Sequence, residues 1–409
     1  MLSWSSQFNI CCFLDDHNYG LPPHTYECLL GAGALHVTEA AAGSAFQQLK
    51  IFSEQHKDWL FGHLAYYLKN EVESLSSSHT DGVKFPDLFF FVPETVIRLQ
   101  QSAMIISCSA KDPATVFDEI CNTQIDDKEK HSDGIAINSR FNKEEYLQVV
   151  RALQKHILRG DCYEINFCQE FFAEHCRIHP LSVYRALTEI SPNPFTAFYK
   201  TNDKYLLCAS PERYLKKTGP LVVSQPVKGT WQRNLHDAKL DEQMKLELFN
   251  SAKDRAENVM IVDLVRNDLS RICEESSVKV DELFGIYSFP QVHQMISTVS
   301  GELKAGLHWA DAVRATFPMG SMTGAPKKRV MELIEQYERT RRGIFSGAVG
   351  YVSPEGDFDF NVVIRSILYN ETSEYLSYQV GSGITFYSDA EKEYEECLLK
   401  AIAIKKVLE

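Results

Sequence analysis

A lysine between a proline and a Gly-Thr pair is the clearest candidate for chemistry in this chain, within Gln225-Pro226-Val227-Lys228-Gly229-Thr230. Proline fixes its own φ and glycine permits a left-handed backbone, so Lys228 is predicted to sit on a rigid corner. A partly desolvated ammonium loses much of its preference for the charged form, and the neutral amine can then attack carbon. Glu212, in the preceding turn, is the nearest candidate for an acid that assists the leaving group. A solvated turn lysine is the alternative for this segment taken alone.

Two pairs of acidic residues have the spacing that places side chains on one face of a helix. Asp254 and Glu257 are separated by three positions, and Glu393 and Glu396 repeat this arrangement near the C-terminus. Carboxylates on rigid helices suit a hard cation such as Mg²⁺, which takes few carboxylates and keeps several waters. For either pair taken alone, a solvated helix face is the favoured interpretation, because surface glutamates are common.

Polar groups within apolar segments indicate where an anion would bind. Arg365 lies in a strand-like apolar run from Val362 to Leu368, where an unpaired cation would be costly. A ligand carboxylate could pair with it, and an internal salt bridge is the alternative. The backbone N–H groups of Gly381-Ser382-Gly383 are a candidate anion-binding nest.

The regular segments predict mixed helices and strands without a repeating βαβ period, which favours an α+β or layered α/β fold. Phe85 to Pro93 reads as a buried strand, and Tyr163 to Glu174 as another. Asn142 to Arg159 and Leu181 to Ile190 read as helices. A polar, charged stretch predicts a surface linker over residues 122–137. It would separate an N-terminal region, 1–121, packed on the core, from a catalytic domain, 138–409.

Composition excludes several classes of protein. The 409 residues are 44% hydrophobic, enough for a large core, and carry a formal net charge of −13. That charge argues against non-specific binding to nucleic acid or to an anionic membrane. The 11 cysteines have no framework or zinc spacing, and no apolar run reaches the length of a membrane span. A cytoplasmic location is expected. No phosphate-loop, dinucleotide or hydrolase motif is present.

Taken together, the ordered motifs resemble those of the chorismate-utilising enzymes, over about residues 138 to 409. The segments that carry the resemblance are Ser210-Pro211-Glu212-Arg213, Pro226-Val227-Lys228-Gly229-Thr230, Lys253-Asp254-Arg255-Ala256-Glu257-Asn258, Val262-Asp263-Leu264-Val265-Arg266-Asn267-Asp268-Leu269, Phe317-Pro318-Met319-Gly320-Ser321-Met322-Thr323-Gly324-Ala325-Pro326-Lys327, Gly347-Ala348-Val349-Gly350-Tyr351, Val363-Ile364-Arg365-Ser366, Gly381-Ser382-Gly383-Ile384 and Glu393-Tyr394-Glu395-Glu396.

The resemblance implies a set of site residues. Glu257 and Glu396 would bind the Mg²⁺ that holds the ring carboxylate of chorismate. Asp254 and Glu393 would lie behind these ligands or reach the ion through water. Contacts to the substrate are implied for Gly229, Thr230, His293, Thr323, Arg365, Gly381, Ser382 and Gly383. For His293, the alternative is a buried histidine whose ring nitrogens form hydrogen bonds within the protein.

The resemblance also implies a reaction, the amination of chorismate at ring carbon 4 on the route to para-aminobenzoate and folate. Lys228 would attack carbon 2 while Glu212 protonates the departing hydroxyl, and ammonia would then add at carbon 4. Because the sequence contains no glutaminase residues, ammonia is expected from solution or from a separate glutamine amidotransferase subunit.

Three alternatives stay open. Anthranilate-forming members typically carry alanine at the position of Lys228. Members that make isochorismate or salicylate use a lysine to activate water, at a position that corresponds to Glu164 here. A chorismate-binding scaffold without catalysis is the third, although it would have no chemical need for Glu212, Lys228 and both metal-site glutamates together.

Overall fold

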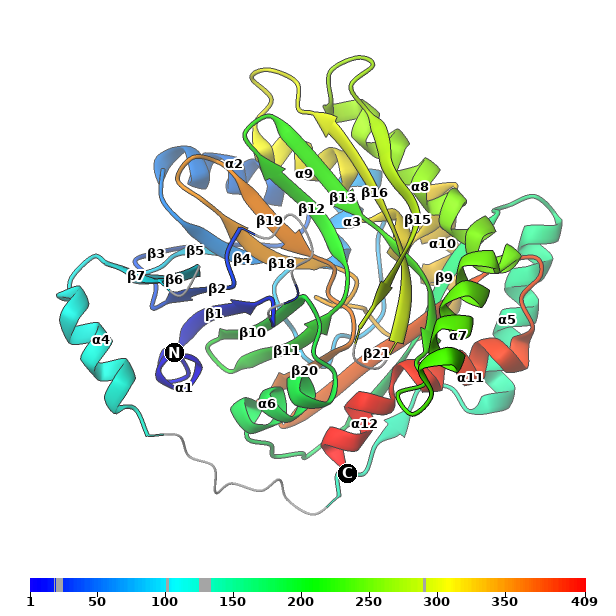
Figure 1. The fold of residues 1–409 in the computed structure, drawn as a ribbon, viewed down its shortest axis with the longest axis horizontal. Coiled ribbons are helices and arrows are strands. Elements are labelled where there is room, and N and C mark those ends of the chain that lie inside the picture. Colours follow the sequence, from blue (N-terminus) through cyan, green and yellow to red (C-terminus); the bar gives the residue numbers. More distant parts are fainter. Residues whose placement is uncertain (18, 20–24, 101–102, 125–133, 290–291) are drawn as a thin grey trace.

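A computed structural model describes the chain except residues 18, 20–24, 101–102, 125–133 and 290–291. Two large antiparallel sheets form its centre (Figure 1). The 11-stranded first sheet runs in the order β17 (Gly324–Ala325), β9 (Glu164–Ala173), β21 (Tyr375–Ile384), β20 (Ser366–Asn370), β11 (Lys204–Ser210), β10 (Phe195–Thr201), β1 (Ile10–Asp15), β2 (Cys28–Ala32), β6 (Thr95–Gln100) and β7 (Ala103–Cys108), with β8 (Asn138–Ser139) paired to β9.

The second sheet has 10 strands. Its order is β14 (Val227–Gln232), β16 (Val292–Glu302), β13 (Leu221–Gln225), β12 (Arg213–Thr218), β19 (Phe358–Asn361), β18 (Ala348–Val352), β4 (Leu60–Leu64), β5 (Leu88–Val92) and β3 (His36–Ala40), with β15 (Lys279–Ser288) paired to β16.

Helices cover both sheets, which gives the layered α+β architecture expected from the sequence (Figure 1). Those that contact the first sheet or its edge strands are α1 (Leu2–Ser5), α4 (Pro113–Asn122), α5 (Lys143–Leu158), α6 (Pro180–Ile190), α10 (Lys327–Tyr337) and α11 (Ala390–Lys400), and α12 (Ile402–Leu408) lies on α6. Those beside the second sheet are α2 (Ala45–Gln55), α7 (Ala238–Asn250), α8 (Ala252–Ile272) and α9 (Trp309–Thr316). Short turns are η1 (Tyr66–Leu68), α3 (Lys69–Glu73) and η2 (Gly320–Met322).

The two faces of the first sheet belong to two different hydrophobic clusters. In β1, Cys12 faces the cluster between the sheets, whereas Cys11 and Phe13 face the cluster beneath the helices. This alternation follows from the two-residue period of a strand, and it explains why both faces read as apolar in the sequence. All 11 cysteines are free thiols.

The N-terminal region is built into the same sheets as the rest of the chain. Strand β1 pairs with β10, and β4 pairs with β18. Residues 1–121 therefore supply strands to both sheets rather than packing on a finished core. Within the predicted linker 122–137, residues 125–133 lie outside the described part.

Most of the predicted elements are confirmed. Helix α5 begins after Asn142, whose side chain accepts from the Glu145 backbone while Glu145 caps Asn142 in return. Strands β5 and β9 and helix α6 match their predicted ranges within a few residues. None of the helices in the described part of the chain has the length and apolar composition that a bilayer crossing requires.

Candidate active site

A cavity of about 620 Å³ opens beside β14, β9 and β21, within the size range of small-molecule sites. Helices α8 and α11 and the β11–β12 turn complete its wall. The predicted residues that line it are Glu212, Lys228, Gly229, Thr230, Asp254, Glu257, Arg365, Gly381, Ser382, Gly383 and Glu396. The fold thus brings together side chains from distant parts of the sequence, which the motifs could not place relative to one another.

Lys228 lies in a β-bulge rather than in the turn expected from the sequence. The register of β14 against β16 shifts between Val227 and Thr230, so Lys228 and Gly229 fall in the irregular part. Gly229 has φ of 89°, the left-handed conformation predicted for it. A bulge re-aims the side chains of a strand, and here it directs Lys228 into the cavity.

The ammonium of Lys228 donates to Glu164 Oε1 at 2.6 Å. Both side chains are buried, with exposures of 11% for Lys228 and 1% for Glu164. Burial alone would lower the pKa of Lys228, but the charges of Glu164 and Glu257 outweigh it and hold that pKa above its usual range. The expectation that desolvation favours the neutral amine is therefore wrong for the free enzyme. Lys228 rests as an ammonium and must lose a proton before it can attack.

Gly383 provides the space for this ion pair. A Cβ at Gly383 would lie 2.6 Å from Glu164 Oε1 and 2.9 Å from Lys228 Nζ. The three residues of Gly381-Ser382-Gly383 are strand residues of β21, paired with β9 from Cys168 to Asn166. The predicted nest of N–H groups is therefore wrong, because these backbones extend along a ladder, and small size is what the glycines contribute.

Glu212 is buried in the turn between β11 and β12. Burial raises its pKa to about 7, although contacts with Ser321 and Lys228 act in the opposite direction. A carboxyl group with this pKa is partly protonated near neutrality, as a general acid must be.

The acidic pairs meet at the cavity wall, where a lysine already contacts them. Lys253 Nζ lies 3.1 Å from Glu393 Oε1 and 3.8 Å from Glu257 Oε1. Burial raises the pKa of Glu257 to about 7, whereas Lys400, at 2.8 Å, lowers the pKa of Glu396 to about 2. Glu393 is buried and is absent from the cavity lining.

The carboxylates fit a hard cation in their chemistry. Glu257 Oε1 and Glu393 Oε2 are buried, and no residue in the described part of the chain forms a hydrogen bond with either oxygen. Free carboxylate oxygens of this kind are the ligands that Mg²⁺ takes. In the described ranges, however, no three His, Cys, Asp or Glu side chains are already grouped as a metal site. Bound water and a ligand would have to supply the remaining positions.

Arg365 lies in a short irregular segment between two strands, not within the continuous strand expected from Val362 to Leu368. Strand β19 ends at Asn361 and β20 begins at Ser366, and Arg365 has φ of 52° between them. Its side chain lines the cavity, and the part of the chain that the structure describes offers it no ion pair. Burial lowers its pKa, with Glu396 acting against this. A ligand anion is the partner that this guanidinium lacks.

The structure does not bring His293 and Thr323 to the cavity lining, unlike the other residues predicted to contact the substrate. His293 Nε2 lies 3.0 Å from Asp241 Oδ1, and its Nδ1 lies 2.9 Å from Ser288 Oγ. The Thr323 hydroxyl donates to the carbonyls of Met319 and Gly320, both at 3.2 Å. Each is a satisfied buried group with a structural role.

Their neighbours Gln294 and Ser321 line the cavity in their place. Among the described residues, both amide atoms of Gln294 are buried without a hydrogen-bond partner, whereas the Ser321 hydroxyl lies beside Glu212. The period of a strand places Gln294 on the face opposite His293. That alternation is the signal in the sequence that identifies Gln294.

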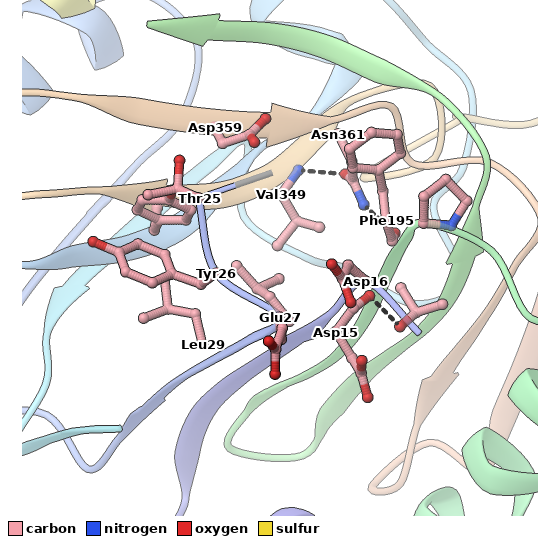
Figure 2. Close-up of a pocket in the computed structure, with 14 residues that line it drawn as sticks. Asp15, Asp16, Thr25, Tyr26, Glu27, Leu29, Phe195, Val349, Asp359 and Asn361 are labelled. Atoms are coloured by element: carbon pink, nitrogen blue, oxygen red, sulfur yellow. Dashed lines mark hydrogen bonds between the residues drawn. The ribbon is translucent and has the colours of Figure 1, made fainter. Parts of the chain in front are cut away.

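A second, smaller cavity lies between the sheets and is lined by the acidic residues Asp15, Asp16, Glu27 and Asp359 (Figure 2). Its volume is about 60 Å³, roughly a tenth of the cavity at Lys228. The larger cavity is therefore the candidate active site.

Comparison with known proteins places this chain in a family. Residues 24–406 match the model of the chorismate binding enzymes. Aminodeoxychorismate synthase component 1 from Bacillus subtilis is 32% identical over 362 residues, 85% of this chain and 76% of the relative. The Escherichia coli protein of the same name is 40% identical over 271 residues, 66% of this chain and 59% of the relative.

A solved structure has the same fold. Anthranilate synthase component I from Streptococcus pneumoniae superposes with a TM-score of 0.82 at 24% identity, over 94% of this chain and 93% of that one. The family match covers most of the chain and includes the strands from β2 to β7 in the N-terminal region. The protein belongs to the chorismate binding enzymes.

Proposed function

We propose that this chain is component 1 of an aminodeoxychorismate synthase and converts chorismate and ammonia to 4-amino-4-deoxychorismate. One observation carries the proposal: Lys228 and Glu212, a nucleophile and a carboxyl group whose pKa is raised to about 7, line the same cavity. Relatives that bear this name support it. The Synechocystis relative at 33% identity is called anthranilate synthase component I-like, so anthranilate formation is the competing function. Lys228, in place of alanine, favours amination at carbon 4.

The mechanism uses the side chains at the cavity. Arg365, which lacks a protein anion, would bind a carboxylate of chorismate. The amine of Lys228 attacks ring carbon 2, and Glu212 gives its proton to the hydroxyl that leaves carbon 4 as water. Ammonia adds at carbon 4 and displaces the lysine. Covalent attachment at carbon 2 thereby directs the amino group to carbon 4.

Mg²⁺ is the metal that we propose for the carboxylates. Glu257 and Glu396 would hold it, with Asp254 and Glu393 nearby. When bound, it supplies positive charge for a substrate carboxylate. The buried oxygens without partners on Glu257 and Glu393 support this assignment.

Lys253 should compete with the metal, because its ammonium contacts both Glu393 and Glu257. Replacing Lys253 by Met keeps most of the length of the side chain and removes its charge, so Mg²⁺ should bind more tightly. Lys253 is 45% exposed, and solvent screening limits the expected gain to roughly three- to tenfold in Kd. Isothermal titration of the protein without substrate measures the Kd.

A matched control is Lys392→Met. Lys392, on α11, lines the same cavity, and among the described residues it forms no ion pair with Glu257 or Glu393. The Lys392→Met variant should leave the Kd for Mg²⁺ nearly unchanged. An unchanged or weaker Kd in Lys253→Met would show that this ammonium does not compete with the metal.

The name component 1 in the relatives implies a second component. We propose that this component is a glutamine amidotransferase that supplies ammonia, and that the isolated chain uses free ammonia.

The test of the proposed function is an assay of the purified chain with chorismate, Mg²⁺ and an ammonium salt at alkaline pH. We expect 4-amino-4-deoxychorismate, identified by mass and ultraviolet spectrum. Glutamine in place of ammonium should give no product. Anthranilate as the main product would overturn the assignment, and turnover with glutamine alone would overturn the need for a second component.

A further inference from the structure

We propose that Glu164 is the base that takes the proton from the Lys228 ammonium when the lysine attacks and returns it when the lysine leaves. This inference rests on the proposed function, since it concerns the same covalent reaction. In the sequence, Glu164 stood out only because it replaces the lysine that activates water in other members, and the proposal assigns it a catalytic role.

The first support is geometric. Glu164 Oε1 lies 2.6 Å from Lys228 Nζ, in direct hydrogen-bond contact, and it is the one acceptor of that ammonium within the described ranges. Strand β9 carries Glu164 and β14 carries Lys228, so the two groups are fixed by separate sheets. Gly383 leaves the space that both side chains occupy.

The second support is the state of the other oxygen. Glu164 Oε2 is buried and has no hydrogen-bond partner among the described residues. A carboxylate that served only to hold a cation would be expected to have its second oxygen satisfied as well. With no donor at Oε2 to stabilise its charge, the carboxylate can instead accept the Lys228 proton at Oε1.

The third support is the surrounding charge. The pKa of Lys228 is raised by three carboxylates, Glu164 from β9, Glu212 from the β11–β12 turn and Glu257 from α8. The charge of Lys228 in turn lowers the pKa of Glu396 on α11. Spontaneous loss of the proton to water is therefore rare near neutrality. Transfer along a 2.6 Å hydrogen bond to Glu164 separates no charge, because the ion pair becomes a neutral amine beside a neutral acid.

The proton balance closes over the cycle. In the first half, the proton moves from Lys228 to Glu164, the nitrogen–carbon bond forms at ring carbon 2, and Glu212 protonates the departing hydroxyl to water. The adduct is then a secondary ammonium, with Glu164 neutral and Glu212 ionised. In the second half, ammonia bonds to carbon 4, the bond from carbon 2 to Lys228 breaks, and Glu164 reprotonates the released amine. Glu212 takes the proton from the new ammonium on carbon 4, which restores both groups.

The test compares rates of adduct formation from chorismate without ammonia, followed by intact-protein mass from pH 7 to pH 9. In Glu164→Gln, the lysine must release its proton to solvent, so its rate should depend on hydroxide. The ratio of the wild-type rate to the variant rate should then be on the order of a hundred at pH 7, in line with loss of a general base, and shrink about tenfold per pH unit. Taking the ratio cancels the pH dependence of Glu212, which is common to both proteins.

Two variants separate catalysis from structure. Glu164→Asp keeps a proton acceptor at a longer distance, so its rate should be reduced while its ratio to the wild type stays constant with pH. Glu170→Gln removes another buried carboxylate from β9. Glu170 is paired with Arg140 at 2.9 Å and does not line the cavity, so this variant should leave the pH profile unchanged.

Each outcome has a distinct meaning. A ratio for Glu164→Gln that does not change with pH, or a variant faster than the wild type near pH 7, would overturn the role of Glu164 alone. Amination without any adduct in the wild type would overturn the covalent mechanism and this role with it. Failure to use chorismate at all would overturn the proposed function.

Discussion

Replacing Lys228 by Ala should abolish the covalent adduct and reduce formation of 4-amino-4-deoxychorismate by on the order of a thousandfold or more, the scale of losing a nucleophile. The wild type, incubated with chorismate and no ammonia, should gain the mass of chorismate minus one water, and peptide mapping should place that mass on Lys228. The variant carries the alanine of anthranilate-forming members. Its residual chemistry should therefore move toward direct attack of ammonia at carbon 2, with traces of aminodeoxyisochorismate or anthranilate.

Loss of the lysine also leaves Glu164 buried without its partner. An uncompensated buried charge of this kind costs about 3–5 kcal/mol of the free energy of unfolding, so thermal denaturation must accompany the assay. The double variant Lys228→Ala, Glu164→Gln removes both charges and should regain most of the stability while still forming no adduct. Lys228→Arg should also be nearly inactive, because a guanidinium does not deprotonate to attack carbon. An unchanged rate in Lys228→Ala would show that this lysine is a structural residue.

The sequence predicted which residues line the cavity better than it predicted their local conformations. The motif with Lys228 predicted a turn, because proline and glycine are turn residues, but edge pairing with β16 accommodates the same residues as a bulge. The run around Arg365 predicted a strand from its apolar neighbours, and it is broken by a left-handed residue that hydrophobic periodicity does not reveal.

Contacts between distant segments were beyond what the sequence could predict. Glu164 and Lys228 are brought together by two different sheets, and Lys253 reaches Glu393 from another helix. These contacts decide that Lys228 rests as an ammonium and that the carboxylates already have a cation beside them. His293 and Gln294 show the same limit on a smaller scale, because the motif identified the segment but the pleat of β16 decides which of the two faces the cavity.

Replacing Glu212 by Gln should slow adduct formation by on the order of a hundredfold or more. It should also abolish the decline of the rate with rising pH. Burial raises the pKa of Glu212 to about 7, so the acid is protonated below that pH and ionised above it. A general acid acts only while protonated. The wild-type rate of adduct formation should therefore fall as the pH rises through about 7, by up to tenfold per unit. Glutamine has no proton to donate and does not titrate, so the variant should lack this decline.

The binding of chorismate separates this role from a structural one. Glu212→Gln keeps the size of the side chain, so the Kd for chorismate should change little while the rate of adduct formation falls. Glu212→Asp should keep the declining limb at a lower rate, because it retains an acid. If the decline through about pH 7 persists unchanged in Glu212→Gln, another group protonates the leaving hydroxyl. Glu257, whose pKa burial also raises to about 7, would then be the next residue to test.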